Sequence, residues 1–219
     1  MSFIIKSTNI GDGINSRRVL IEENKKLFLI KCTDENEILI NSKYTPKLYS
    51  INERKYFDLN VEKHNYIYKY QYIAGSTLID LKLTNRLFIN VLKLYKTLFG
   101  RGCFIWDSPL NNIIVDKKES IFFVDLGGID NHPCKIGLVF FKKQPLDTSD
   151  EELTERFIVF YLAHELLEMD YSTLSDKNKR VLSKMYEEDP KKRYKTYSEI
   201  FRDIIMIRGF VLNRVAINE

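Results

Sequence analysis

The stretch from Asp107 to Gly127, Asp-Ser-Pro-Leu-Asn-Asn-Ile-Ile-Val-Asp-Lys-Lys-Glu-Ser-Ile-Phe-Phe-Val-Asp-Leu-Gly, decides how this chain is interpreted. It holds two short apolar runs, Asn112 to Val115 and Ile121 to Val124, which are joined by polar residues. Apolar runs of this length on either side of a polar turn predict a β-hairpin. A hairpin returns its two ends to one place, so the residues at those ends should lie close together.

Oxygen-bearing side chains mark the ends of this predicted hairpin. Asn112 opens it, Asp125 closes it, and Asp107 lies on the loop that precedes it. Carboxylate and amide oxygens grouped in this way suit Mg²⁺, which takes one or two carboxylates together with substrate phosphates. Taken singly, the same residues are also typical of loop caps and turns. As a group they predict a magnesium and phosphate site.

The first third of the chain reads as strands. Val19 to Ile21 and Leu27 to Ile30 are β-rich runs separated by a polar turn, and Lys55 to Leu59 and Tyr66 to Ile73 follow. The last run carries tyrosine at every second position, so one face of that strand should carry the rings. The interval from Asp34 to Ser42 has room for one short helix.

Helices are predicted for most of the chain after Gly75. Arg86 to Phe99 has the apolar stripe of an amphipathic helix that Gly100 ends. Further helices are predicted at Thr154 to Glu168, Ser175 to Tyr186 and Tyr197 to Val215. We therefore expect an α+β fold of one domain, with residues 1–74 forming a small, mainly β lobe and residues 75–219 a helical lobe. Ligands often bind between two such lobes.

Composition narrows the classes of function. The chain has 219 residues, of which 44% are hydrophobic and 29% charged, as is typical of a folded globular protein. Its 34 basic and 30 acidic residues are mixed, which argues against nucleic acid as a partner. The cysteines Cys32, Cys103 and Cys134 have unrelated spacings and predict reduced thiols. Without a recognisable signal peptide or membrane span, we expect a cytoplasmic monomer with no membrane partner, while signal-independent secretion stays open.

Asp107, followed five residues later by Asn112 at the start of a strand, resembles the catalytic loop of the protein-kinase superfamily. Val124-Asp125-Leu-Gly resembles the DFG motif of that family, with leucine in place of phenylalanine. The resemblance implies that Asp107 orients or deprotonates the acceptor hydroxyl. It also implies that Asn112 and Asp125 hold Mg²⁺ on the phosphates of ATP.

Further motifs follow in the order of the same family. Gly11-Asp-Gly13 with Val19 after it is similar to the glycine-rich loop, and Phe28-Leu-Ile-Lys31 resembles the strand that carries the phosphate-binding lysine. Lys31 is then a catalytic residue alongside Asp107. Tyr70 to Gly75 looks like the hinge whose backbone meets adenine. The ATP-binding residues that the resemblance implies are Gly11, Gly13, Val19, Lys31, Gln71, Tyr72 and Ile73.

The second half of the chain extends the resemblance. Glu155 to Leu167 is similar to the buried helix of the large lobe, and Leu182 to Arg193 is similar to a late segment of protein kinases. Small-molecule phosphotransferases share the catalytic loop but not this late segment, so they are a third and less favoured reading. The shortened chain resembles the minimal, effector-like kinases of some bacteria.

Partners for two motif residues stay open. The carboxylate that should pair with Lys31 is Glu35 or Glu37, with Glu53 as a further alternative. Arg193 normally pairs with a glutamate of a motif that this chain lacks.

Two hypotheses of function follow. The first is an active ATP- and Mg²⁺-dependent protein kinase, with Ser/Thr acceptors favoured over Tyr and a protein as substrate or regulatory partner. The second is a pseudokinase that binds nucleotide and a partner as a scaffold. The enzyme is favoured by four retained motif residues: Lys31, Asp107, Asn112 and Asp125. The scaffold is favoured by Ile105 and Trp106 in place of His-Arg, and by Pro109 in place of a lysine that contacts the transferred phosphoryl group.

Overall fold

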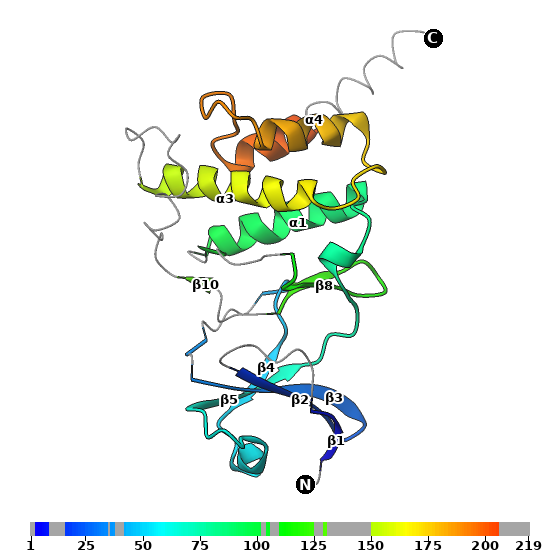
Figure 1. The fold of residues 1–219 in the computed structure, drawn as a ribbon, viewed down its shortest axis with the longest axis vertical. Helices are drawn as coiled ribbons and strands as arrows, with labels where there is room; N and C mark the ends of the chain where they lie inside the picture. The colour runs from blue at the N-terminus through cyan, green and yellow to red at the C-terminus, as the bar shows by residue number, and fades with distance from the viewer. Residues whose placement is uncertain are drawn as a thin grey trace. The chain divides into compact units, whose positions relative to one another are not determined.

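The structure is a computed structural model that describes residues 3–8, 16–34, 36–37, 42–101, 104–105, 110–124, 129–130 and 150–205. It contains antiparallel sheets and helices, which confirms the α+β class (Figure 1). The chain separates into two compact units. Met1–Gly75 and Ile113–Ile129 form the first, and Ser76–Asn112 and Asp130–Glu219 form the second. The predicted central hairpin therefore groups with the first unit, whereas the sequence assigns it to the lobe of residues 75–219.

The first unit is built on a five-stranded antiparallel sheet with the strand order β1-β2-β3-β5-β4 (Figure 1). Its strands are β1 (Ile4–Ser7), β2 (Ser16–Glu23), β3 (Lys26–Thr33), β4 (Leu48–Ile51) and β5 (Tyr66–Gln71). Asn24 and Lys25 make the turn between β2 and β3, with φ angles of 52° and 61°. A two-residue turn with positive φ at both positions matches the twist of the strands that it joins. This turn pairs Glu23 with Lys26 and so sets the register of the hairpin.

One face of this sheet carries the apolar core of the unit. Alternate residues of β2, β3 and β5 are buried there: Val19, Ile21, Phe28, Ile30, Cys32 and Ile67. Tyr56 and Leu59 join this core from the 3-10 helix η1 (Arg54–Leu59). The predicted strand from Lys55 to Leu59 is wrong. The buried residues Tyr56 and Leu59 are three apart, which is the period of a 3-10 turn, while Phe57 between them is 52% exposed.

Cys32 is fully buried in this core and forms no disulfide. Burial raises the pKa of its thiol to about 11, so the thiol stays protonated and unreactive at neutral pH. This observation agrees with the predicted reduced thiol. Cys103 and Cys134 lie outside the described residues.

The opposite face of the sheet carries three stacked tyrosines of β5: Tyr66, Tyr68 and Tyr70, termed here the tyrosine ladder. Successive ring centroids lie 5.8 Å apart, with planes 22° and 23° from parallel. The predicted alternation is confirmed for these three residues, although β5 ends at Gln71 rather than at Ile73. Directly paired residues of neighbouring strands share a face. The pairing of Tyr68 with Lys31 therefore places the ladder beside that lysine.

The predicted central hairpin is confirmed. It consists of β8 (Ile113–Val115) and β9 (Ile121–Phe123), with Ile113 paired to Phe123. The carboxylate of Asp116 accepts two backbone N–H groups of the turn at 2.8 Å each, which closes it.

The second unit is mainly helical. Its helices are α1 (Asn85–Phe99), α3 (Asp150–Leu167), α4 (Asp176–Met185) and a helix at residues 197–205 (Figure 1). The hydroxyls of Thr84 and Ser175 cap α1 and α4 by accepting N–H groups of the first helical turn. The helices predicted after Gly75 are confirmed within the described residues, whereas Asn36 and Glu37, in the interval predicted to hold a short helix, are not helical. The short elements of the chain are β6 (Ser76–Thr77), η2 (Leu78–Asp80), β7 (Phe104–Ile105) and β10 (Ile129–Asp130).

Gly75 approaches β8 so closely that no side chain fits. A Cβ atom there would lie 2.2 Å from the carbonyl oxygen of Val115. We expect Gly75→Ala to displace β8 and to lower the free energy of unfolding by about 1–3 kcal/mol, measured by urea denaturation. Gly100→Ala is the matched control, because the nearest atom to its Cβ would be the Lys96 carbonyl oxygen at 3.3 Å. Equal losses in the two variants would contradict the close approach.

A group of charges is buried at the edge of the apolar core. Glu23 is 4% exposed and accepts hydrogen bonds from Lys55 at 2.6 Å, from the Tyr56 hydroxyl at 3.2 Å and from Lys69. The Lys69 ammonium also lies 4.1 Å from the centroid of the Phe28 ring. Burial alone would raise the pKa of Glu23, but the two ammonium groups outweigh it and lower this pKa to about 2.

The lowered pKa predicts an acid-dependent loss of stability. The contribution of the Glu23 carboxylate is fully present above its ordinary pKa of 4.5 and is lost as the pH falls toward about 2. We expect Glu23→Gln to lower the free energy of unfolding at pH 7 by on the order of 3 kcal/mol and to flatten its pH dependence across this window. Denaturant titrations at several pH values check this. Parallel pH profiles of the two proteins would show that Glu23 is not responsible.

Candidate functional site

Lys31 lies in the middle of β3 on the face that carries the tyrosine ladder. Its neighbours across the strands are Arg18 on β2 and Tyr68 on β5. Lys31 is 4% exposed, whereas a lysine on a solvated strand leaves its ammonium in water. A buried ammonium requires a compensating charge close to it.

Glu37 supplies that charge. Its carboxylate forms an ion pair with the Lys31 ammonium, and Glu37 is 3% exposed. Of the carboxylates that the sequence leaves open, Glu37 is therefore the one that the structure brings to Lys31. Glu53 forms an ion pair with Lys55 at 3.0 Å instead, and Glu35 lies outside the described residues.

Two ladder tyrosines complete the surroundings of Glu37. The Tyr70 hydroxyl donates to the second carboxylate oxygen of Glu37. The Tyr68 hydroxyl accepts the backbone N–H of Glu37 at 3.0 Å and donates to the Asn36 side chain at 3.3 Å. The site thus consists of one ammonium, one carboxylate and two phenols, all of them buried. Asn36, which accepts from Tyr68, is exposed.

The structure does not bring Val19 to this face. Val19 pairs with Ile30 and is fully buried in the apolar core on the other side of the sheet. Leu20 and Leu29 pair with each other on the Lys31 face and are half-buried. The sequence analysis did not place these two leucines beside Lys31. The two-residue turn of Asn24 and Lys25 could have done so, because strand pairing counted outward from that turn puts Leu20, rather than Val19, on the same face as Lys31.

The predicted hinge lies at the end of β5. Gln71 is exposed, and its backbone N–H already donates to the Lys47 carbonyl at 2.8 Å. Tyr72 and Ile73 are half-buried and follow the strand. The backbone groups of these two residues are therefore better candidates than the Gln71 N–H for meeting a ligand.

The central hairpin carries one of the predicted metal ligands. Asn112 is half-buried and directly precedes the Ile113–Phe123 pair. Asp125 follows the same pair two residues later but lies outside the described residues, as do Asp107, Gly11 and Gly13. Within the described residues, no group of three or more His, Cys, Asp or Glu side chains could hold a metal ion.

Arg193, whose usual partner is missing from the sequence, binds backbone instead. Its guanidinium donates to the Glu187 carbonyl and, at 3.0 Å, to the Glu188 carbonyl. The same group lies 4.0 Å from the centroid of the Phe160 ring on α3. Backbone acceptors and an aromatic face therefore hold the Arg193 guanidinium in the described part of the chain.

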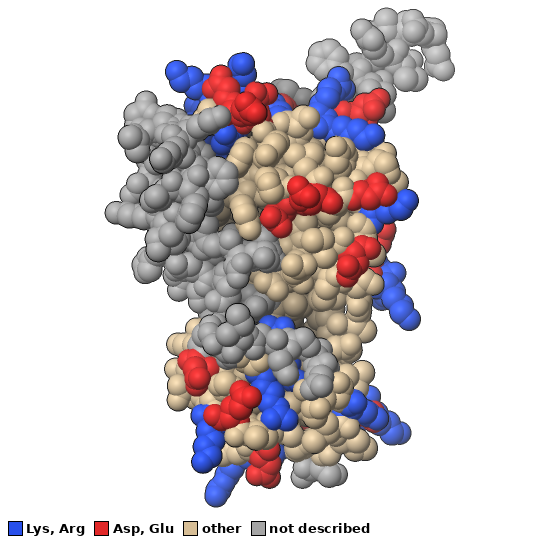
Figure 2. Space-filling model, in the orientation of Figure 1, with Lys and Arg blue, Asp and Glu red and all other residues tan. Residues whose placement is uncertain are grey.

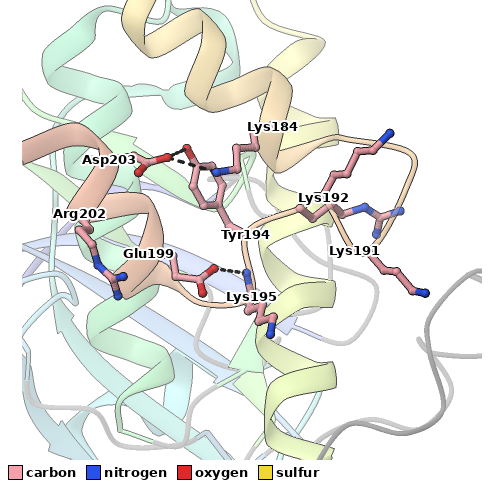
Figure 3. Close-up of a pocket in the computed structure, with 9 residues that line it drawn as sticks. Lys184, Lys191, Lys192, Tyr194, Lys195, Glu199, Arg202 and Asp203 are labelled. Atoms are coloured by element: carbon pink, nitrogen blue, oxygen red, sulfur yellow. Dashed lines mark hydrogen bonds and ion pairs between the residues drawn. The ribbon is translucent and has the colours of Figure 1, made fainter. Parts of the chain in front are cut away.

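A second concave region lies within the second unit. A cavity of about 290 Å³ there is lined by Lys184, Lys191, Lys192, Arg193, Tyr194, Lys195, Glu199, Arg202 and Asp203. Asp203 accepts from the Tyr194 hydroxyl at 2.7 Å and from Lys184 at 3.3 Å (Figure 3). The charged ends of Lys191, Lys195 and Arg202 point in different directions in Figure 3 and do not converge on one ligand. This cavity is therefore a weaker candidate than the Lys31 face.

Surface charge is of mixed sign. Basic and acidic side chains are intermixed on the face of the molecule drawn in Figure 2. In the described part of the chain, we find no helix with the length and apolar character needed to cross a membrane.

Comparison with protein-family models and with curated proteins gave no match. No protein-family model matches this sequence, and no curated protein matches it. The functional interpretation therefore depends on the order of the sequence motifs and on the geometry of the Lys31 face.

The ion pair itself predicts a pattern of stability. Glu37→Gln keeps an acceptor for the Tyr70 hydroxyl but leaves the Lys31 ammonium buried without a counter-charge, which should cost about 3–5 kcal/mol of the free energy of unfolding. The double variant Lys31→Met/Glu37→Gln removes both charges and should recover most of this loss. Denaturant unfolding of the three proteins checks the pattern. A double variant as unstable as Glu37→Gln would mean that the two charges do not compensate each other.

Proposed function

We propose that this chain binds ATP with Mg²⁺ and transfers the γ-phosphoryl group to a hydroxyl of a protein, with serine or threonine favoured. Its two units would be the lobes of a minimal protein-kinase fold. The observation that carries the proposal is the buried ion pair of Lys31 and Glu37 on one face of the five-stranded sheet. The order of the motifs from Gly11 to Arg193 supports it.

A ligand explains this ion pair better than stability does. Burial of two charges costs free energy that their attraction only partly returns, so a buried salt bridge is weak support for a stabilising role. An ammonium that a carboxylate holds in one place is a positioned positive charge. Phosphate oxygens are the ligands that such a charge suits. We therefore assign Lys31 to the phosphates of the nucleotide.

The neighbouring surface suits the other end of a nucleotide. Leu20 and Leu29 offer half-buried apolar side chains on the Lys31 face. Leu29 precedes Lys31 by two residues, which is about 7 Å along an extended strand. An aromatic base on the leucines and a phosphate at the ammonium would therefore meet the same face of the sheet.

The remaining roles come from the sequence motifs. Asn112 and Asp125 would hold Mg²⁺, and the bound ion would supply positive charge to the phosphates. Asp107 would accept the proton of the acceptor hydroxyl while the oxygen of that hydroxyl bonds to the γ-phosphorus. The bond from that phosphorus to the bridging oxygen then breaks, and ADP leaves.

The proposal predicts separate effects on binding and on transfer. We expect Mg-ATP to raise the melting temperature of the protein by mass action. Asp107→Asn should keep that shift, because the carboxylate serves the acceptor hydroxyl, and should lower phosphoryl transfer by about 10²–10⁴-fold. Calorimetric melting and autophosphorylation with labelled ATP measure the two effects.

Two further variants test the residues proposed to bind the nucleotide and its metal ion. Asp125→Ala should remove most of the Mg²⁺-dependent part of the shift, and Lys31→Met should weaken both nucleotide positioning and transfer. A protein that melts unchanged in millimolar Mg-ATP would overturn the proposal. A protein that binds Mg-ATP, transfers nothing and retains its effect on a partner in the Asp107→Asn form would be a pseudokinase scaffold.

A further inference from the structure

Glu37 is placed by strands that lie far from it in sequence. Asn36 and Glu37 belong to neither a helix nor a strand. Yet Lys31 and Tyr70 each hold one carboxylate oxygen of Glu37, and Tyr68 holds its backbone N–H. These partners come from the neighbouring strands β3 and β5. The sheet, rather than local secondary structure, therefore sets the position of this carboxylate.

The two phenols are themselves firmly held. Tyr68 is 1% exposed and Tyr70 is 5% exposed, and their rings stack on each other in the tyrosine ladder. A buried, stacked ring has little rotamer freedom, so its hydroxyl has a defined place. Burial also raises the pKa of Tyr68, which keeps this phenol neutral and able to donate to Asn36.

Lys31 alone would not provide the same order. An ammonium is a compact charge on a flexible stem, and it specifies distance but little direction. A carboxylate bound only to that ammonium could rotate with it. A phenol on the second oxygen fixes the plane of the carboxylate, and this fixes the place of the ammonium.

We propose that Tyr70, assisted by Tyr68, is a positioning residue for phosphoryl transfer: its hydroxyl orients Glu37, which in turn orients Lys31 on the phosphates of the nucleotide. This inference rests on the function proposed above. Two side chains of β5 would hold the Glu37 carboxylate, because Asn36 and Glu37 belong to no helix or strand that could do so.

The test is the Tyr70→Phe variant, which removes one hydroxyl and keeps the ring in the ladder. Loss of positioning should act on the transfer step, because binding energy from the base remains. We expect kcat for autophosphorylation to fall by about 10-fold to 100-fold while KM for ATP changes by less than about 3-fold. Assays run well below the melting temperature of each variant keep altered stability out of the comparison.

Tyr66→Phe is the matched control. Tyr66 stands on the same strand and in the same stack, and within the described part of the chain it contributes no hydrogen bond to Glu37. We expect it to retain the kcat of the wild type. Tyr68→Phe, which removes the bond to the Glu37 backbone, should give a smaller decrease than Tyr70→Phe. It also provides a second test should Tyr70→Phe fail to fold.

A double variant distinguishes positioning from a general structural effect. In a Glu37→Gln background, the side chain at position 37 no longer carries the charge that holds Lys31, so adding Tyr70→Phe should change kcat by less than about 2-fold. Equal kcat values for Tyr70→Phe and Tyr66→Phe in an active protein would overturn this inference alone. A wild-type protein that neither binds Mg-ATP nor transfers phosphate would overturn the proposed function and the inference with it.

Discussion

Strand β5 holds two buried ion pairs in place, one on each face of the sheet of the first unit. Tyr68 and Tyr70 reach Glu37 on one face, while Lys69 between them reaches Glu23 on the other. A shift of β5 by one residue would carry Lys69 to the ladder face and the tyrosines into the apolar core. Buried charges thus oppose any slip of the register, in addition to the packing of the apolar side chains.

The two ion pairs differ in what surrounds them. Glu23 is bound by two lysines and by a tyrosine of η1, and one of the lysines also rests on the Phe28 ring. This group closes the edge of the apolar core, and its Lys55 side chain is 32% exposed. The pair of Lys31 and Glu37 instead shares its face with the half-buried Leu20 and Leu29. The combination of a positioned charge and apolar surface is typical of a binding site.

In the second unit, backbone carbonyls and an aromatic ring hold a buried arginine. Arg193 is 7% exposed, and its guanidinium donates to the backbone carbonyls of Glu187 and Glu188. The guanidinium also packs on the ring of Phe160 on α3. The turn that contains Glu187 and Glu188 is thereby fastened to a helix of the core.

The amino-acid sequence by itself determined the elements whose causes are local. The hairpin around Asp116, the helix that Thr84 caps and the alternation of the tyrosines all follow from neighbours within a few residues. Only the tertiary structure decided which carboxylate meets Lys31, because Glu37 is held by Tyr68 and Tyr70, which lie more than 30 residues further along the chain. It also decided the 3-10 form of η1, because Tyr56 and Leu59 pack into the apolar core of the sheet. Contacts of this kind join residues that are far apart in the chain, so a short stretch of sequence does not specify them.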